Sequence, residues 1–248
     1  MDPPLELPFS QLNNFPLVAF VTTRSGGVSR PPYDTLNMAY LTADDRDSVR
    51  TNRERVAGGL GLAHDELLIG RQVHGGVVNK AEDVELGTTL GDAIILTQPE
   101  SAAMVVAADC LPLVFYDPRI HVGAVAHAGW RGLQAGILAN TVASLESAGG
   151  AASAVLVGIG PGIGICCYEV GPEVIRGVGA RSAEWRPGQG DRAYLDLVAV
   201  AERQLEAAGV SAGNVHAVAV CTRCNSDRYF SARAGEPTGR FAAGLKLL

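Results

Sequence analysis

Residues 107–132 (AADCLPLVFYDPRIHVGAVAHAGWRG) are almost continuously apolar, yet they contain a thiol, Cys110, and an imidazole, His127. A thiol and an imidazole that meet in a folded protein can exchange a proton, as in a nucleophilic dyad, or bind one metal ion together. Free cysteine is also among the residue types most often buried in a core. These residues alone therefore leave two equal interpretations, a reactive site and a packed core.

The elements around this pair predict a β-hairpin. Residues 112–117 and 120–127 are rich in β-forming residues, and Pro118 between them suits a turn. A two-residue turn places Cys110 directly opposite His127, with the two Cβ atoms about 4.5–5.5 Å apart. Because proline disfavours the tightest hairpin turns, a bulge that shifts the register by one residue is the alternative.

An anion site is predicted next to the end of this hairpin. Residues 130–150 (WRGLQAGILANTVASLESAGG) have helical spacing and end in glycines, so Trp130 and Arg131 fall in the first turn of a helix. Free backbone amides at a helix N-terminus attract anions, and the guanidinium of Arg131 adds to this attraction. We therefore expect a thiolate, an imidazole and an anion site to lie together.

Elsewhere the chain alternates predicted strands and helices, which is typical of a mixed α/β (α+β) fold. Its 248 residues suffice for one large domain or two small ones; the stretch 147–154 is short and uncharged, more typical of a loop than of a domain linker, which favours a single domain over residues 1–248. The three glycines in ELLIGRQVHGGVVNKA indicate bulges or close approaches of the backbone. The further predicted strands are 17–23, 66–81, 101–108, 154–159 and 215–220, and the further predicted helices are 44–60, about 169–178, and 194–208.

Composition excludes several classes of partner. The 248 residues carry a net charge of −6, which disfavours binding to nucleic acid or to an acidic membrane. The N-terminal residues lack the pattern of a signal peptide, and Asp109 interrupts the longest apolar stretch, so no membrane helix is expected. A cytoplasmic location follows, in which the five cysteines are reduced and serve metal binding or catalysis rather than disulfides.

Three other motifs give weaker signals. Cys221 and Cys224 form a CxxC pair after a predicted strand, but no second CxxC pair accompanies it. The adjacent Cys166 and Cys167 are poorly placed to bind one metal ion together, so we expect them to serve packing. GIGPGIG (158–164) lacks the third glycine of a dinucleotide-binding loop, and no nucleotide cofactor is indicated.

With these residues in view, the chain from about Leu17 to Leu248 resembles the YfiH-like family. This family has long been labelled a multicopper polyphenol oxidoreductase or laccase domain. Its members are now described as purine nucleoside phosphorylases, and one subgroup is called peptidoglycan editing factor. The matching stretches are TTRSGGVS (22–29), LNMAYLTADDRDSVRTNRERV (36–56), RQVHG (71–75), ADCLPLVFYD (108–117), AVAHAGWRG (124–132), GIGPGIGICCYEVG (158–171) and DRYFSARAGEPTGRFAAGLKL (227–247). ADCxP followed by HAGWRG is very specific.

The resemblance implies a fold of stacked mixed β-sheets flanked by helices, and a catalytic zinc ion held by His74, Cys110 and His127. Three protein ligands leave the fourth tetrahedral position open, as in catalytic zinc sites. Two departures from the family pattern, Ile165 in place of a common proline and the unusual Cys224, do not touch these ligands.

The activity implied by the resemblance is phosphorolysis of adenosine, inosine and S-methyl-5′-thioadenosine, with deamination of adenosine as a companion activity. Zinc-activated water is the nucleophile of other zinc deaminases, which agrees with the ligand set. The partners are then purine nucleosides and phosphate, and the oligomeric state is left open. Arg131 is the first candidate for binding phosphate and Arg24 the second, and Asn37 is a further candidate for binding substrate or phosphate. A structural role is the alternative for all three residues.

Three rival functions use the same residues. One cysteine and two histidines also suit a blue-copper centre, but His74 and His127 leave only three of the five histidines for an oxygen-reducing cluster, so a laccase mechanism is disfavoured. Cys110 and His127 could act as a metal-free hydrolase dyad in peptidoglycan editing. A purely structural zinc is the third rival, although structural sites normally fill all four positions with protein ligands.

Overall fold

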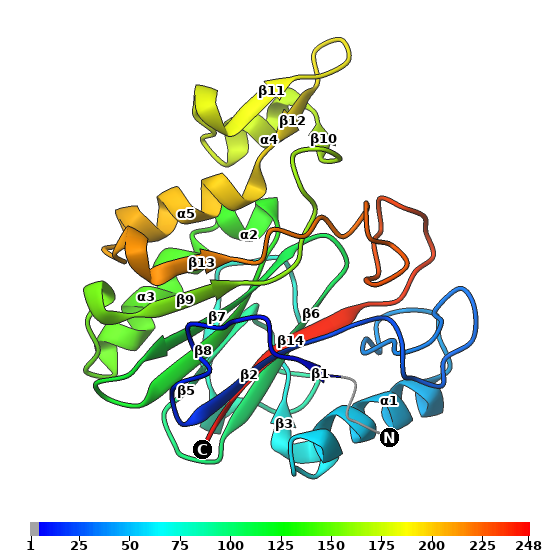
Figure 1. Cartoon of the computed structure of the whole chain (residues 1–248), viewed down its shortest axis with the longest axis vertical. Coiled ribbons are helices and arrows are strands. Elements are labelled where there is room, and N and C mark those ends of the chain that lie inside the picture. Colours follow the sequence, from blue (N-terminus) through cyan, green and yellow to red (C-terminus); the bar gives the residue numbers. More distant parts are fainter. Residues whose placement is uncertain (1–4) are drawn as a thin grey trace.

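The computed structural model describes residues 5–248, in which two mixed β-sheets stack face to face, with a small third sheet and five α-helices around them (Figure 1). The strands of the five-stranded sheet are, in order, β1 (Leu5–Glu6), β2 (Leu17–Thr22), β14 (Phe241–Leu247), β6 (Ala102–Ala107) and β3 (Leu67–Leu68). Those of the six-stranded sheet are β13 (Val215–Ala217), β9 (Leu156–Ile159), β7 (Leu111–Asp117), β8 (Val122–Ala128), β5 (Ala93–Leu96) and β4 (Val78–Lys80).

The remaining elements cover these sheets or connect their strands. The small sheet has the order β10 (Glu169–Val170), β12 (Ala193–Leu195) and β11 (Trp185–Pro187). The helices are α1 (Arg46–Gly59), α2 (Trp130–Gln134), α3 (Ile137–Ser147), α4 (Pro172–Gly177) and α5 (Leu197–Ala207). Short 3₁₀ turns occupy His64–Glu66, Ala81–Asp83, Ala152–Ala154, Ser182–Glu184 and Ala212–Asn214.

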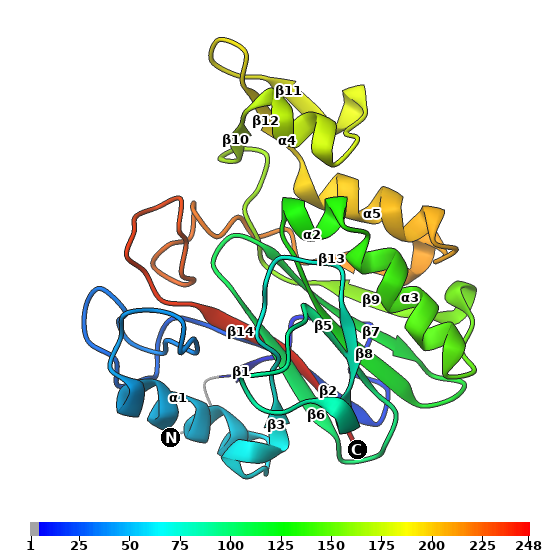
Figure 2. The same cartoon turned by 180° about the vertical axis from the view of Figure 1, so that it is seen from behind.

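The layers run helix, sheet, sheet, helix (Figure 2). Side chains on β7 alternate: Val114 and Tyr116 enter the core between the two sheets, whereas Leu113 and Phe115 pack with residues of α3 and α5. A third cluster buries Val56 and Ala57 of α1 with residues on the outer face of the five-stranded sheet. The predicted architecture of stacked mixed sheets flanked by helices is therefore confirmed.

The hairpin of β7 and β8 exists, but the predicted register is wrong. His127 pairs with Pro112, and the first paired residue of β7 is Leu111 rather than Cys110. The turn is longer than predicted because the carboxylate of Asp117 accepts a hydrogen bond from the Arg119 amide at 3.0 Å and so shapes a turn of four residues, 118–121. Cys110 consequently lies just before β7, at the end of the hairpin.

The predicted helix over residues 130–150 is also wrong, because it is two helices. Gly136 adopts a left-handed φ of 75° between α2 and α3 and breaks the chain direction. α2 has only five residues, so it offers a much smaller dipole than the predicted helix. The predicted helix over residues 44–60 is confirmed as α1, and its N-cap, Asp45, accepts a hydrogen bond from the Ser48 amide at 2.9 Å.

Residues 66–81 do not form the continuous strand that we predicted. Only β3 and β4 are strands here, and the irregular segment between them includes His74 with a left-handed φ of 59°. The predicted close approach of the backbone is confirmed at Gly76, where a Cβ atom would stand 2.4 Å from the carbonyl oxygen of Ala135. None of the helices within residues 5–248 combines the length and the apolar composition needed to span a bilayer.

Candidate metal centre and cavity

His74, Cys110 and His127 converge at one end of the β7–β8 hairpin. The Sγ atom of Cys110 and one ring nitrogen of each histidine all lie within 4.8 Å of one another. Metal–ligand bonds of the usual zinc lengths would place such atoms roughly 3.3–3.6 Å apart in a tetrahedral site. One soft thiolate and two imidazoles are also ligands that zinc prefers, so the residues fit the metal that the family resemblance implies.

Gly129 makes room for this convergence. It follows β8 directly and is the N-cap of α2. A Cβ atom at position 129 would lie 2.6 Å from Sγ of Cys110 and 3.4 Å from Cδ2 of His74. The absence of a side chain therefore lets the thiol and the imidazole approach each other across the end of the hairpin.

Asp92, directly before β5, holds both histidines in place. Its carboxylate accepts hydrogen bonds from the amides of Val73, His74 and Gly75 at 3.1, 3.0 and 2.8 Å, which fixes the left-handed turn that carries His74. The same carboxylate accepts a bond of 2.9 Å from Nδ1 of His127. Nε2 of His127 is thereby left as the nitrogen for a metal, the arrangement of carboxylate, histidine and metal common in metalloproteins.

The electrostatic surroundings of Cys110 and His127 favour the charged form of each side chain. Burial disfavours the thiolate of Cys110, but the positive charge and hydrogen bond of His127, helped by His74, lower the pKa of Cys110 to about 6. Burial likewise disfavours the imidazolium of His127, but the thiolate of Cys110 and the carboxylate of Asp92 raise the pKa of His127 to about 9. Without a metal, the two groups form a thiolate–imidazolium pair at neutral pH.

This pair predicts a reactive Cys110 in the metal-free protein. After chelation, Cys110 should be alkylated by iodoacetamide at pH 7, and the rate should fall as the pH drops below about 6, where the thiolate takes up a proton. Cys166 is an internal control, because partial burial and the neighbouring thiol of Cys221 raise the pKa of Cys166. Peptide mass spectrometry measures both rates, and a rate for Cys110 that rises only above pH 8 contradicts the prediction.

Asp109 fixes the main chain next to Cys110. It is buried, has a left-handed φ of 95°, and accepts hydrogen bonds from the Thr222 and Ser231 hydroxyls, both at 2.6 Å, and from the Arg233 amide at 2.8 Å. These bonds tie residues 222–233 to the main chain beside Cys110. Asp109 is thus a positioning residue, whereas from the sequence alone it stands out only as a charge within an apolar stretch.

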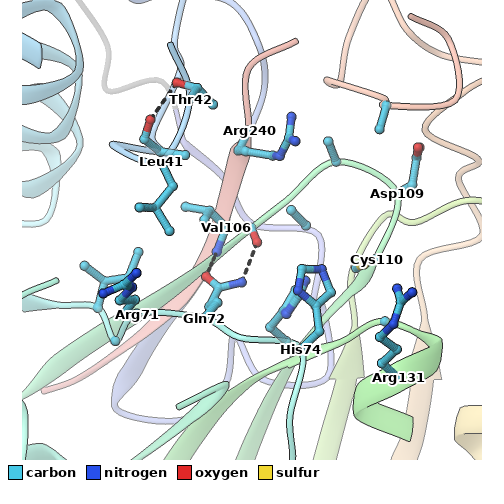
Figure 3. A pocket seen from close by; sticks show the side chains of 18 of the residues that line it. Leu41, Thr42, Arg71, Gln72, His74, Val106, Asp109, Cys110, Arg131 and Arg240 are labelled. Atoms are coloured by element: carbon cyan, nitrogen blue, oxygen red, sulfur yellow. Dashed lines mark hydrogen bonds between the residues drawn. The ribbon is translucent and has the colours of Figure 1, made fainter. Parts of the chain in front are cut away.

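A cavity of about 470 Å³ is lined by His74, Cys110 and His127, the three side chains that could hold a metal ion. Figure 3 shows Arg131 close to His74 and Cys110, with Arg240 and Arg71 on other parts of the wall. Gln72 forms one wall by pairing with the main chain of Val106 through two hydrogen bonds, of 2.8 and 2.9 Å. The further lining side chains of note are Tyr40, Arg53, Asp109, Trp130, Tyr168 and Arg233.

The structure separates the three residues that we predicted to bind phosphate. Arg131 lines the cavity, and its guanidinium stacks on the Trp130 ring at 4.4 Å. Arg24 lies outside the cavity lining and donates hydrogen bonds to the carbonyls of Asp34 and Ser226 at 3.0 and 2.6 Å. Asn37 is fully buried and bonds to the loop at residues 39–44 and to the Arg240 amide, so it shapes the cavity wall from behind.

Several residues of the site were missed by sequence reasoning. Asp92 is a single acidic residue directly before the wholly apolar strand β5, and this position was a usable signal because a buried charge needs partners. Tyr168, Arg233 and Arg240 come from segments 58–130 residues after Cys110. Only the fold brings these three residues to the cavity.

Comparisons with known proteins find relatives that match nearly the whole chain. Residues 18–247 match the family model described as multi-copper polyphenol oxidoreductase laccase. The chain is 40% identical over 233 residues to a purine nucleoside phosphorylase of Pseudomonas aeruginosa, with 91% of each chain covered. It is 34% identical over 235 residues to purine nucleoside phosphorylase YfiH of Escherichia coli, with 94% of each covered.

Solved structures with similar sequences have the same fold. A crystal structure of a hypothetical protein YfiH from Bacillus licheniformis superposes with a TM-score of 0.91 at 28% identity, covering 99% of this chain and 97% of that one. The crystal structure of YlmD from Geobacillus stearothermophilus gives a TM-score of 0.89 at 31% identity, covering 98% and 94%. The similarity extends over nearly the whole chain in both cases.

Proposed function

Because this chain belongs to the YfiH-like family described as multi-copper polyphenol oxidoreductase laccase, we propose that it is a zinc-dependent purine nucleoside phosphorylase. Its relatives named purine nucleoside phosphorylase support enzymatic activity on a purine nucleoside and phosphate. The proposed substrates are adenosine, inosine and S-methyl-5′-thioadenosine. Deamination of adenosine is the proposed companion activity in the same cavity.

The positive charge of the cavity is the main observation that supports this proposal. Five arginines line it (Arg53, Arg71, Arg131, Arg233 and Arg240), whereas Asp109 is the single acidic residue that residues 5–248 contribute to the lining. The Asp109 carboxylate is already engaged by Thr222, Ser231 and the Arg233 amide. A protein with a net charge of −6 thus has a cationic cavity beside its metal ligands, which suits an anionic substrate such as phosphate.

Phosphorolysis needs such a cavity because an anion is the nucleophile. A phosphate oxygen forms a bond to C1′ of the ribose while the bond from C1′ to the purine nitrogen breaks. The base leaves with the electron pair and gains a proton, and the products are the free base and ribose 1-phosphate. Arginines that orient phosphate against C1′ would lower the barrier by positioning it and by offsetting the repulsion among its charges.

Arg131 and Arg71 are the arginines best placed for this role. Within residues 5–248, neither guanidinium donates a hydrogen bond to another group of the chain, whereas Arg53 and Arg240 donate to main-chain carbonyls. Arg131 also lines the same cavity as His74 and Cys110 (Figure 3). Its donors are therefore available to phosphate beside the metal site.

The other parts of the cavity suit a nucleoside. Tyr40, Trp130 and Tyr168 offer aromatic surfaces against which a purine can pack. When bound by His74, Cys110 and His127, zinc would supply a Lewis acid that activates water at neutral pH, which deamination requires. The histidines and the cysteine hold the metal, and Asp92 keeps His127 in the required orientation.

The histidine positions favour zinc over a laccase mechanism. Of the five histidines, only His74 and His127 line the cavity. His121 bonds to the Tyr116 hydroxyl and to the Leu248 carbonyl, and His64 and His216 lie on other elements. Residues 5–248 thus provide no second group of imidazoles, which an oxygen-reducing copper cluster would need.

A nucleoside panel tests the proposal. Zinc-loaded protein is incubated with adenosine, inosine or S-methyl-5′-thioadenosine, with and without phosphate, and free base and ammonia are measured. We expect base release that depends on phosphate, and ammonia release from adenosine that does not. Base release by none of the three nucleosides would overturn the phosphorylase proposal, and full activity after removal of all metal would point instead to a metal-free Cys110–His127 dyad.

Arg131→Ala separates the two proposed activities. Loss of a hydrogen bond to charged phosphate should weaken phosphate-dependent base release by about 1.5–3 kcal/mol, seen mainly as a higher phosphate requirement. Deamination uses no phosphate and should fall much less. Arg176→Ala, at an exposed arginine of α4 outside the cavity lining, is the matched control and should change neither activity. Equal loss of both activities would show that Arg131 supports the scaffold or the nucleoside.

A further inference from the structure

The four cysteines other than Cys110 form a second cluster. Cys166 and Cys167 lie in the turn between β9 and β10, and Cys221 and Cys224 lie in the segment that follows β13, which runs beside that turn (Figure 1). The four Sγ atoms all lie within 4.8 Å of one another. Two pairs that are more than 50 residues apart in the sequence thus meet at one point of the surface.

Adjacent cysteines are poorly placed to bind one metal ion together, but the turn at residues 164–168 removes this difficulty for Cys166 and Cys167. The amides of Cys167 and Tyr168 both donate to the Gly164 carbonyl, at 2.9 and 3.0 Å, and this curls the chain. As a result, both thiols of the adjacent pair face one sulfur: Cys224 Sγ is 3.6 Å from Cys166 Sγ and 3.4 Å from Cys167 Sγ. Our expectation that this pair serves only packing does not account for this geometry.

The backbone of the two segments holds the cluster together. Residues Gly162 and Cys221 pair as in a parallel β-bridge, and the Gly164 amide donates to Cys221 Sγ at 3.3 Å. A Cβ atom at Gly164 would lie 3.2 Å from Cys221 Cβ and 3.3 Å from Cys166 Sγ. A glycine here keeps the space that the sulfur atoms need, and an amide aimed at sulfur stabilises a thiolate.

We propose that Cys166, Cys167, Cys221 and Cys224 bind one zinc ion as a tetrathiolate site, distinct from the site of His74, Cys110 and His127. Tetrahedral zinc with four bonds of about 2.3 Å to sulfur would place its ligands about 3.8 Å apart, close to the spacing of this cluster. Four protein ligands fill the coordination sphere, which is the pattern of a structural zinc site. The sulfur atoms lie well beyond a disulfide bond length of about 2.05 Å, so no pair is joined.

A zinc ion at this second site would hold one wall of the cavity in place. Tyr168 directly follows Cys167 and lines the cavity, and the Arg233 guanidinium lies 5.0 Å from the Tyr168 ring. Thr222 directly follows Cys221 and bonds to Asp109, the neighbour of Cys110. Metal at the tetrathiolate site would thus fix the two segments that form one wall, and its loss should raise KM for the nucleoside more than it lowers kcat.

Measuring the number of zinc ions per chain tests the proposal directly. The protein reconstituted with zinc and freed of excess metal should hold two ions per chain, Cys110→Ser one, the Cys166→Ser/Cys224→Ser double variant one, and the triple variant none. The two single-site variants are reciprocal controls, because each removes ligands of one site and keeps the other. Equal zinc in the wild type and in a folded double variant would overturn the proposal.

Two measurements on the Cys110→Ser protein do not depend on folding of the double variant. With cobalt in place of zinc, four thiolates give intense sulfur-to-metal charge-transfer bands, which a site with one thiolate cannot match. With zinc bound, the four remaining thiols should resist a thiol reagent and become accessible once a chelator is added. Weak cobalt bands, thiols that react equally with and without metal, or disulfides recovered under reducing preparation would each overturn the proposal.

Discussion

Asp92→Asn should weaken zinc binding by about 10–100-fold and reduce activity with it, the usual cost of losing the carboxylate partner of a metal-binding histidine. Asp92 is almost fully buried, and its two oxygens accept four hydrogen bonds, from three consecutive amides and from His127. Burial opposes the charge, but the bonds from His127 and the amides hold the pKa of Asp92 below its usual value. An asparagine has an NH₂ group in place of one carboxylate oxygen. Its two N–H donors would face the N–H groups that now donate to Asp92.

Stability should fall together with metal binding. Breaking a buried charged pair costs about 3–5 kcal/mol of the free energy of unfolding, since the remaining partner is left without compensation. Asp117→Asn is the matched control: Asp117 is also fully buried and accepts bonds from Arg119 and from the Ala151 amide, but it lies at the far end of β7 from the metal site. Both variants should unfold more readily, and only Asp92→Asn should lose zinc affinity in competition with a chelator.

A zinc affinity unchanged by Asp92→Asn would show that Asp92 supports only the fold. His127 would then be held in place by its main-chain pairing in β8, and the thiol of Cys110 would dominate metal binding. The comparison with Asp117→Asn excludes a general loss of stability as the cause of any change in metal content.

Gly129→Ala should abolish metal binding and lower activity at least about 100-fold, because displacement of a reacting group by about 1 Å has effects of this size. The added methyl group would stand 2.6 Å from Cys110 Sγ, closer than the atoms can approach, so the thiol has to move. Cδ2 of His74 lies 3.4 Å from the same position and further limits where the methyl group can shift. The backbone of Gly129 is ordinary, with a φ of −81°, so the effect is one of space rather than of backbone strain.

Gly132→Ala is the matched control for this substitution. Gly132 is in the same HAGWRG motif, within α2, and a Cβ atom there would make ordinary contacts of 3.4–3.5 Å. Alanine in a helix also reduces the entropy of the unfolded chain, worth about 0.4–1 kcal/mol. Gly132→Ala should keep zinc and activity; a Gly129→Ala protein with full zinc content would contradict the proposed role of the glycine.

Local sequence patterns predicted the parts of the fold that depend on local interactions. α1 was predictable because Asp45 caps it and glycines end it, and the β7–β8 hairpin because both strands are rich in β-forming residues. The register was not predictable, since it depends on one hydrogen bond from the Arg119 amide to the Asp117 side chain. Gly136 likewise divides a regular helical pattern through its left-handed backbone, which the spacing of apolar residues does not reveal.

The metal ligands and the rest of the site differ in how far sequence alone could identify them. The resemblance to the family implied His74, Cys110 and His127 as the metal ligands, and the structure brings them together. The pairing of Cys110 with His127 was reached through a wrong register, and the two residues meet because Cys110 precedes β7 beside Gly129. Asp92 and the four-cysteine cluster depend on contacts across 35 to 58 residues, which no local spacing encodes.

The position of β14 has a consequence for how the chain folds. This strand is the middle of the five-stranded sheet, yet it pairs with β2, more than 200 residues earlier in the sequence, and with β6. Pairing across such separations slows folding, and until it occurs β2 and β6 present open edges that can pair with other chains. Arg240 directly precedes β14, so the arrival of this one strand both closes the sheet and completes the cationic cavity. A chain in which β14 has not yet paired would therefore both expose strand edges and lack a complete cavity.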